Sequence, residues 1–101
     1  MSVIMMMRVK ADADAVEKYA KGHSDQMRKI ADEGKSKGAI HHYFAASDDG
    51  EVLVIDEWPT EEAFKAFFDS QSEIPKVMQG VGAQGKPEIA FYRKLTTPDE
   101  F

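Results

Sequence analysis

The sequence predicts an α+β fold with a four-stranded antiparallel sheet, in the ferredoxin-like order β-α-β-β-α-β. Three observations lead to this prediction. The chain has 101 residues, which is the length of one domain. Four short segments have the composition of strands, and the segments between them have helical periodicity. We expect residues 1–95 to form a single domain and residues 96–101 to form a C-terminal tail.

The first strand and the first helix are expected within residues 3–33. Residues 3–10 form a nearly continuous apolar run, which indicates a strand that is buried on both faces. Residues 11–33 predict one long helix that begins after Asp12 or Asp14. Gly22 weakens the middle of this helix by about 1 kcal/mol relative to alanine. The inward stripe of the helix comprises Val16, Ala20, His23, Met27 and Ile30.

A hairpin is predicted in the middle of the chain. Its two strands are expected at residues 39–47 and 52–58, and Asp48-Asp49-Gly50 between them is a typical hairpin turn. In the second of these strands, Leu53 and Ile55 point to one face. The opposite face of the same strand receives Val52, Val54 and Trp58.

The remaining elements follow a proline that ends the hairpin. Pro59 cannot continue the strand, and Thr60 is suited to cap a helix with acidic residues in its first turn. A further helical stretch is expected at residues 72–81 and the last strand at 88–95. The buried side of the helix after Thr60 comprises Ala63, Phe64, Phe67 and Phe68.

Every predicted strand carries apolar residues on both faces. In the ferredoxin-like order both helices cover the same face of the sheet. The other face would then expose an apolar patch of roughly several hundred Å², which is larger than a monomer normally exposes. We therefore expect a homodimer in which two sheets meet face to face. The alternative is a monomer whose tail covers the sheet, but residues 96–101 are too few for that.

Composition excludes several classes of function. The net charge of −5 and the lack of a basic run argue against nucleic acid and anionic membranes as partners. The absence of cysteine excludes disulfides, thiolate metal sites and a cysteine nucleophile, and is compatible with the cytoplasmic location that we expect. The apolar opening segment is too short for a membrane span. No zinc, phosphate-binding or dinucleotide motif is present.

Residues 54–64, which read VIDEWPTEEAF, resemble the strand-to-helix junction of the antibiotic biosynthesis monooxygenase family. In that family an acidic residue stands two positions before an aromatic residue, and a helix with an Ala-Phe-like pair follows. Asp56, Trp58 and Ala63-Phe64 fill these positions. The resemblance implies a dimeric α/β-barrel protein. It also implies oxidation of a small phenolic or quinol-type aromatic, which reacts directly with oxygen without a metal or flavin.

The chain departs from the family pattern in two respects. Phe67 stands where the family often has a histidine. A haem-degrading branch with a similar fold relies on an asparagine, an aromatic residue and a histidine, whereas this chain contains no asparagine. Haem degradation is therefore not expected.

The histidines His23, His41 and His42 are the candidate catalytic residues. Because His41 and His42 are adjacent on a strand, they point to opposite faces and cannot easily share a metal. The pattern does not tell which of them faces the helices. His23, on the inward stripe, would approach the one that does. Such a pair can act as acid and base. The alternative is that all three are core or interface histidines.

Five further residues are expected to contact a substrate. Asp56 lies inside an apolar strand and needs a partner, for which Arg8, Arg93 and Lys94 are the candidates. A structural ion pair is the alternative role for this carboxylate. Aromatic residues can form a flat pocket for an aromatic ligand, although core packing would explain them equally. The expected substrate-binding set is Tyr43, Asp56, Trp58, Phe67 and Phe91.

Two functions follow from these observations. The first is a monooxygenase that uses a histidine base and no cofactor. The second is a non-catalytic dimer of the same fold, which binds a small ligand or has a structural role. A set of polar groups that converge on a cavity would favour the first.

Overall fold

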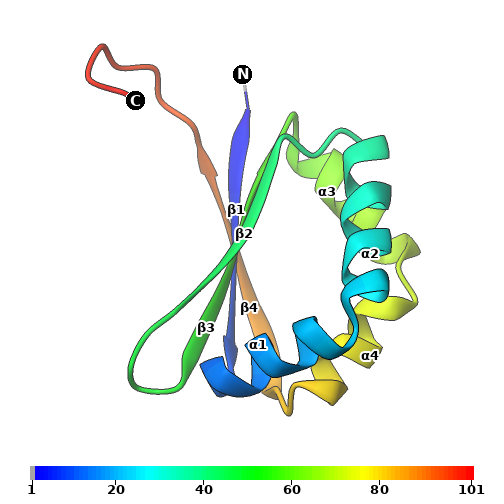
Figure 1. Cartoon of the computed structure of the whole chain (residues 1–101). Coiled ribbons are helices and arrows are strands. Elements are labelled where there is room, and N and C mark those ends of the chain that lie inside the picture. Colours follow the sequence, from blue (N-terminus) through cyan, green and yellow to red (C-terminus); the bar gives the residue numbers. More distant parts are fainter. Residues whose placement is uncertain (1) are drawn as a thin grey trace.

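The computed structural model describes residues 2–101, which form one four-stranded antiparallel sheet with four helices on one of its faces (Figure 1). The strands are hydrogen-bonded in the order β2-β3-β1-β4, which confirms the predicted ferredoxin-like arrangement. The elements are β1 (Val3–Lys10), α1 (Ala13–Gly22), α2 (Ser24–Ser36), β2 (His41–Ala46), β3 (Glu51–Trp58), α3 (Glu61–Ser70), α4 (Glu73–Gly80) and β4 (Gln84–Arg93).

The single long helix predicted over residues 11–33 is wrong. The chain forms α1 and α2 instead, and His23 lies at the break with a non-helical backbone (φ −131°, ψ 40°). Its N–H still donates to the carbonyl of Tyr19, which closes the last turn of α1. Gly22 directly before the break has the weak helix propensity that makes this position the easiest one to interrupt. As a result His23 is exposed, and its predicted place on the buried stripe is also wrong.

The turn and cap signals around β3 are confirmed. Gly50, at the end of the Asp48-Asp49-Gly50 turn, has a φ of 87° that favours glycine. At the other end of β3, the Thr60 hydroxyl accepts a hydrogen bond of 3.1 Å from the N–H of Ala63. This cap starts α3 and directs it back over the sheet.

The last strand begins earlier than predicted, at Gln84 instead of residue 88, and ends at Arg93. Its pairing with β1 shifts register between Arg8 and Lys10, and this bulge allows the additional residues to join the sheet. Residues 94–101 form neither helix nor strand, and Figure 1 shows them leading away from the body of the molecule.

The core lies between the sheet and the helices. Register places Met5 opposite Asp56, and Met7 opposite Val54, so that one face of β1 and β3 supplies the floor of the core. Trp58 and Met5 are completely buried there. The buried hydrophobic cluster comprises Met5, Met7, Val9, Ala11, Val52, Trp58, Phe64 and Phe67.

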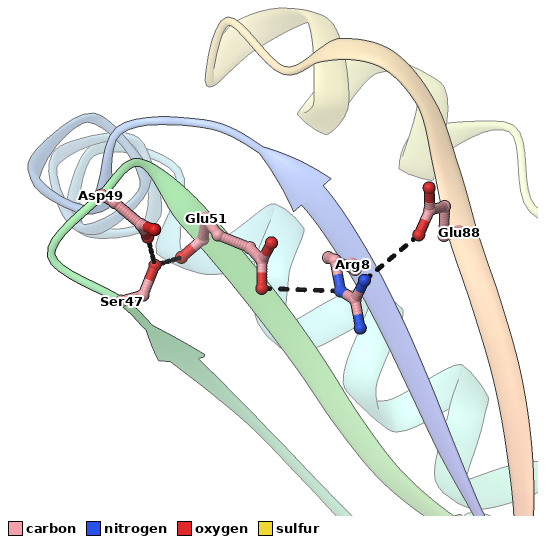
Figure 2. Close-up of polar contacts among 5 residues, drawn as sticks. All are labelled: Arg8, Ser47, Asp49, Glu51 and Glu88. Carbon is pink, nitrogen blue, oxygen red and sulfur yellow. Dashed lines mark hydrogen bonds and ion pairs between the residues drawn. The ribbon is translucent and has the colours of Figure 1, made fainter.

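Within residues 2–101, no helix covers the opposite face of the sheet, which is called the open face below (Figure 1). Tyr43 and Tyr92 on this face are each 56% exposed. The same face carries a charged bridge across three strands, drawn in Figure 2. Arg8 lies 3.5 Å from the carboxylate of Glu51 and 3.3 Å from that of Glu88. The half-exposed apolar residues of the open face are Ile4, Met6, Leu53 and Ile55.

Within residues 2–101, none of the helices combines the length and the apolar character that a membrane span requires.

Candidate functional site

A cavity of about 120 Å³ lies between the helix-covered face of the sheet and the helices. All four helices and strands β1, β2 and β3 contribute to its walls. Most of the lining side chains are aliphatic, methionine or phenylalanine. Among the described lining residues, the side chains with polar atoms other than sulfur are Tyr19, His42, Asp56 and Trp58.

Three of these polar side chains form a hydrogen-bonded chain. His42 and Asp56 face each other across β2 and β3, since the register of the two strands pairs them directly. The Nδ1 atom of His42 lies 2.7 Å from Oδ1 of Asp56. The indole N–H of Trp58 donates to Oδ2 of the same carboxylate over 3.0 Å. Both carboxylate oxygens of Asp56 therefore have a partner, which compensates for its burial.

The structure answers the question that the sequence left open. His42, not His41, faces the helices and the cavity. Its side chain is 44% exposed, whereas that of Asp56 is 8% exposed. The imidazole thus lies at the rim, where the cavity meets solvent, and the carboxylate lies behind it. Because a carboxylate only accepts hydrogen bonds, Asp56 holds the proton of neutral His42 on Nδ1 and leaves the lone pair of Nε2 free.

The predicted cationic partners of Asp56 are wrong. Arg8 points to the open face, because it lies one residue out of phase with Met7 and Val9, and it pairs with Glu51 and Glu88. Lys94 lies 3.8 Å from Glu57 and 3.1 Å from Glu100. Arg93 is exposed and stands opposite Val3 on β1. The helix-covered face thus satisfies Asp56 with a histidine and an indole.

A second polar chain reaches the cavity from the helices. The Tyr19 hydroxyl donates to Oε1 of Gln26 over 2.7 Å, and Nε2 of Gln26 donates to Glu73 over 2.9 Å. The hydrogen bond from Gln26, followed by the charge of Lys76, lowers the pKa of Glu73 from its ordinary value. Glu73 is therefore an anion near neutral pH. This chain fixes the Tyr19 side chain between α1, α2 and α4.

Aromatic rings form one wall of the cavity. Trp58 packs against Phe67 at a centroid distance of 5.3 Å and against Phe64 at 5.8 Å. Phe67, predicted to contact a substrate, lines the cavity together with Trp58. Phe91 packs edge-to-face on Phe64 at 5.6 Å and is outside the lining set.

The remaining predicted site residues lie elsewhere. His41 and Tyr43 are on the open face, where His41 lies 3.9 Å from the buried carboxylate of Glu57. His23 is exposed and stacks on Tyr19 at 3.9 Å, and its Nδ1 lies 3.0 Å from the Tyr19 carbonyl. The predicted approach of His23 to a strand histidine is therefore replaced by a local contact at the helix break. The cavity brings together His42, Asp56, Trp58 and Phe67.

Sequence reasoning missed Tyr19, Gln26 and Glu73. Tyr19 stands three residues after Val16, which is a spacing that places both on the inward side of α1. That spacing was the available signal for Tyr19. No local pattern pairs Gln26 with Glu73, because 47 residues separate them and only the packing of α2 on α4 joins them.

Metal ligands do not gather in this cavity. Across residues 2–101, no group of three His, Cys, Asp or Glu side chains is placed to hold a metal ion.

Solved structures with the same fold cover nearly the whole chain. The cofactor-independent oxygenase SnoaB from Streptomyces nogalater superposes with a TM-score of 0.63 at 15% identity, over 98% of each chain. The monooxygenase ActVA-Orf6 from Streptomyces coelicolor, solved with nanaomycin D, has a TM-score of 0.66 at 18% identity, over 97% of this chain and 93% of the other.

A candidate antibiotic biosynthesis monooxygenase from Bordetella bronchiseptica has a TM-score of 0.68 at 10% identity, over 94% of this chain and 98% of its own. No protein-family model and no curated protein sequence matches the chain. Identities this low establish similarity of fold and leave the chemistry to the residues of the site. The chain therefore has the fold of the antibiotic biosynthesis monooxygenases.

Proposed function

We propose that this protein is a cofactor-independent monooxygenase that oxidises a small phenolic or quinol-type aromatic in the cavity. The observation that carries the proposal is the His42–Asp56 pair at the rim of an apolar cavity. A histidine at the rim of a hydrophobic cavity, backed by a buried carboxylate, is the arrangement that proton abstraction from a bound hydroxyl requires.

In this mechanism Nε2 of His42 takes the proton of a phenolic hydroxyl. Asp56 stabilises the resulting imidazolium through its 2.7 Å hydrogen bond, and Trp58 holds Asp56 in place. The new N–H on Nε2 then faces the phenolate oxygen. The apolar walls exclude water from the electron-rich ring and provide a favourable environment for neutral dioxygen.

The phenolate supplies the electrons for the reaction. A covalent bond forms between dioxygen and a ring carbon that bears a hydrogen atom. The resulting peroxide then accepts a proton and becomes a hydroperoxide. The O–O bond then breaks, the ring carbon loses its hydrogen, and water leaves. One oxygen atom stays on the ring as a carbonyl and the other departs in water. For phenol itself the sum is phenol plus O₂ to benzoquinone plus H₂O.

The structural neighbours support this reaction class. SnoaB is described as a cofactor-independent oxygenase, and ActVA-Orf6 is a monooxygenase that binds nanaomycin D. Their fold spans almost all of this chain. The likeness supports the proposed use of dioxygen, and the His42–Asp56 pair supplies the base in this sequence.

Oxygen uptake tests the proposal. A panel graded by ring number, consisting of hydroquinone, 1,4-naphthohydroquinone and anthrone, is incubated with the protein in an oxygen electrode. We expect uptake with at least one compound, and we expect His42→Ala to lower it by about 10²-fold or more, since general bases contribute about 10²–10⁴-fold.

His41→Ala is the matched control, because His41 is the adjacent histidine on the same strand and faces the opposite side of the sheet. Equal losses in the two variants, or full uptake in His42→Ala, would remove His42 as the base. Binding of these aromatics without uptake would favour the non-catalytic ligand-binding dimer.

We further propose that the open face binds the open face of a second copy. Its apolar residues and the exposed Tyr43 and Tyr92 form a surface that none of the helices in the described part of the chain covers (Figure 1). The arginine of this face is already paired within one chain, since Arg8 bridges Glu51 and Glu88 (Figure 2). A second sheet can therefore approach without burying an unpaired Arg8.

A further inference from the structure

The hydrogen-bond donors of the cavity are already used within the protein. Among the described lining residues, Tyr19, His42 and Trp58 are the side chains with an N–H or O–H group. Tyr19 donates to Gln26, and Trp58 donates to Asp56. His42 places Nδ1 at 2.7 Å from Asp56. With His42 in its neutral form, the groups that these bonds leave free are acceptors.

The direction of the Tyr19 bond is forced by the residues behind it. Glu73, whose pKa is lowered, is a carboxylate that only accepts hydrogen bonds, so the amide nitrogen of Gln26 must point to it. The carbonyl oxygen of Gln26 then points to Tyr19, whose single hydroxyl hydrogen is consumed by that oxygen. The Tyr19 hydroxyl keeps its lone pairs and has no hydrogen left for a ligand.

The same logic fixes the histidine. Asp56 consumes the Nδ1 hydrogen of neutral His42, and Nε2 retains a lone pair. Asp56 itself is an acceptor. The remaining lining side chains are hydrocarbon, methionine or glycine.

We propose that the cavity selects a ligand that brings its own hydrogen-bond donor, a hydroxy-aromatic such as a phenol or quinol, and rejects the corresponding quinone. A phenolic hydroxyl donates a hydrogen bond to Nε2 of His42 or to the Tyr19 oxygen. A quinone carbonyl only accepts hydrogen bonds, so its lone pairs would face the lone pairs of these two acceptors. The inference rests on the proposed function in placing the substrate in this cavity. It adds the redox form of the substrate and assigns Tyr19 to specificity.

The cavity volume limits the size of the ligand. Its 120 Å³ is close to the ~150 Å³ of an apolar cavity that holds benzene. A single hydroxylated ring is therefore the unit that the enclosed part accepts, and any larger ligand must extend past the half-exposed His42.

Binding under argon tests the inference without turnover. Calorimetric titrations compare hydroquinone, p-cresol and 1,4-benzoquinone, which are near-isosteric and offer two, one and no donors. We expect affinity to fall in that order, with benzoquinone at least about tenfold weaker than hydroquinone, because a buried acceptor left without a partner is costly. Mass spectrometry confirms that the quinone has not modified the protein. Equal or tighter binding of benzoquinone, or no binding by any of the three, would overturn the inference.

A variant that releases the Tyr19 hydrogen provides a second test. Gln26→Met keeps the side-chain length and removes the acceptor, so that the Tyr19 hydroxyl becomes free to donate into the cavity. We expect the preference for hydroquinone over benzoquinone to shrink by about fivefold or more in this variant. Gln71→Met is the matched control, since Gln71 bonds Glu33 and does not line the cavity. An unchanged preference in Gln26→Met would remove Tyr19 from the inference.

The two proposals fail separately. Oxygen uptake without a preference for donors would overturn the inference and leave the monooxygenase proposal in place. A clear preference for hydroquinone without oxygen uptake on any substrate would overturn the enzyme proposal and leave a quinol-binding protein.

Discussion

Asp56 is the residue on which the site depends. It is 6% exposed, and it holds the indole of Trp58 with one oxygen and the imidazole of His42 with the other. The register of β3 with β2 places Asp56 directly opposite His42, so that both side chains lie on the same face of the sheet. A carboxylate at this point orients the histidine ring and determines which nitrogen carries the proton.

Asp56→Asn should reverse the tautomer of His42. The single carbonyl oxygen of asparagine can keep the Trp58 bond, and its amide then donates to Nδ1, so that Nε2 receives the hydrogen and ceases to be a base. We expect oxygen uptake to fall by about 10²–10⁴-fold. The ¹⁵N chemical shifts of the His42 ring report the tautomer.

Glu57→Gln is the comparison variant for that change. Glu57 is the next residue on the strand, is also buried, and lies beside His41 on the open face. Its substitution should leave the His42 shifts in place. A free Nε2 in Asp56→Asn, together with native activity, would contradict the assigned role.

At the residue scale, the sequence could predict the members of the site better than their arrangement. His42, Asp56, Trp58 and Phe67 were all recognisable as residue types that suit a ligand site. Which histidine faces the helices was not predictable, because both faces of every strand are apolar and the usual inside–outside alternation is missing. The partner of Asp56 also depends on which face of each strand is turned to the helices. The prediction of a cationic partner was therefore wrong for the same reason.

Among the elements, the packing of α1 on α4 depends on a glycine. A Cβ atom placed on Gly80 would lie 2.2 Å from the ring of Tyr19. The two helices approach closely at this point, and the Tyr19 ring occupies the space that a side chain would need. The chain from Tyr19 through Gln26 to Glu73 then links α1, α2 and α4 around the cavity.

Gly80→Ala should therefore destabilise the protein by about 1–3 kcal/mol, as overpacking does. Gly22→Ala is the control, because nothing lies within 4 Å of its added Cβ and alanine favours helix. We expect that change to be neutral or to stabilise by up to about 1 kcal/mol. Urea unfolding curves of both variants measure the difference. Equal free energies of unfolding would contradict the close packing of Tyr19.

The Glu73 carboxylate makes part of the stability depend on pH. Its pKa is lowered in the folded protein by the Gln26 hydrogen bond and then by Lys76. A group of this kind stabilises the fold above its unfolded pKa, near 4.5, and the contribution is lost as pH falls through the lower folded value. Glu73→Gln should therefore flatten the loss of stability on acidification below about pH 5.

Thermal melts between pH 3 and 7 measure that effect at about one-unit intervals. Glu17→Gln, an exposed glutamate on α1, is the comparison variant. If the melting temperature fell as steeply with acidification in Glu73→Gln as in the native protein, the Gln26–Glu73 bond would be absent in solution.

The break between α1 and α2 illustrates what helical periodicity cannot show. Val16, Ala20, Met27 and Ile30 are partly buried as the stripe predicts, although two helices carry them. Apolar spacing records which residues face the core, and a bend at Gly22–His23 preserves those contacts. The stripe predicted the buried side correctly at four positions and failed at His23, where the backbone leaves the helix.

For the whole molecule, element order and the two apolar faces of the sheet sufficed to predict the fold. Periodicity and turn residues identified the strands, and the short hairpin between β2 and β3 left the ferredoxin-like order as the simplest topology. The hydrogen bond between Gln26 on α2 and Glu73 on α4 could not be predicted in this way, because it joins residues that are distant in sequence and meet only through tertiary packing.

The proposed dimer is tested by mass. Light scattering at micromolar concentration should give about twice 11.3 kDa. Ile55→Lys introduces a charge at the centre of the open face and should yield a monomer. Ala66→Lys adds the same charge to the exposed side of α3 and should leave the mass unchanged. A native mass near 11.3 kDa would contradict the dimer.

The shortage of free donors in the cavity has a consequence for the turnover that we propose. Oxidation would replace the hydroxyl hydrogen that donates to His42 or Tyr19 with a carbonyl that has nothing to donate. The proposed reaction would thus remove the contact by which the ligand is held, and the product would leave a site that no longer favours it. Such an enzyme would keep working as its product accumulates, because quinone would compete poorly with the quinol that remains.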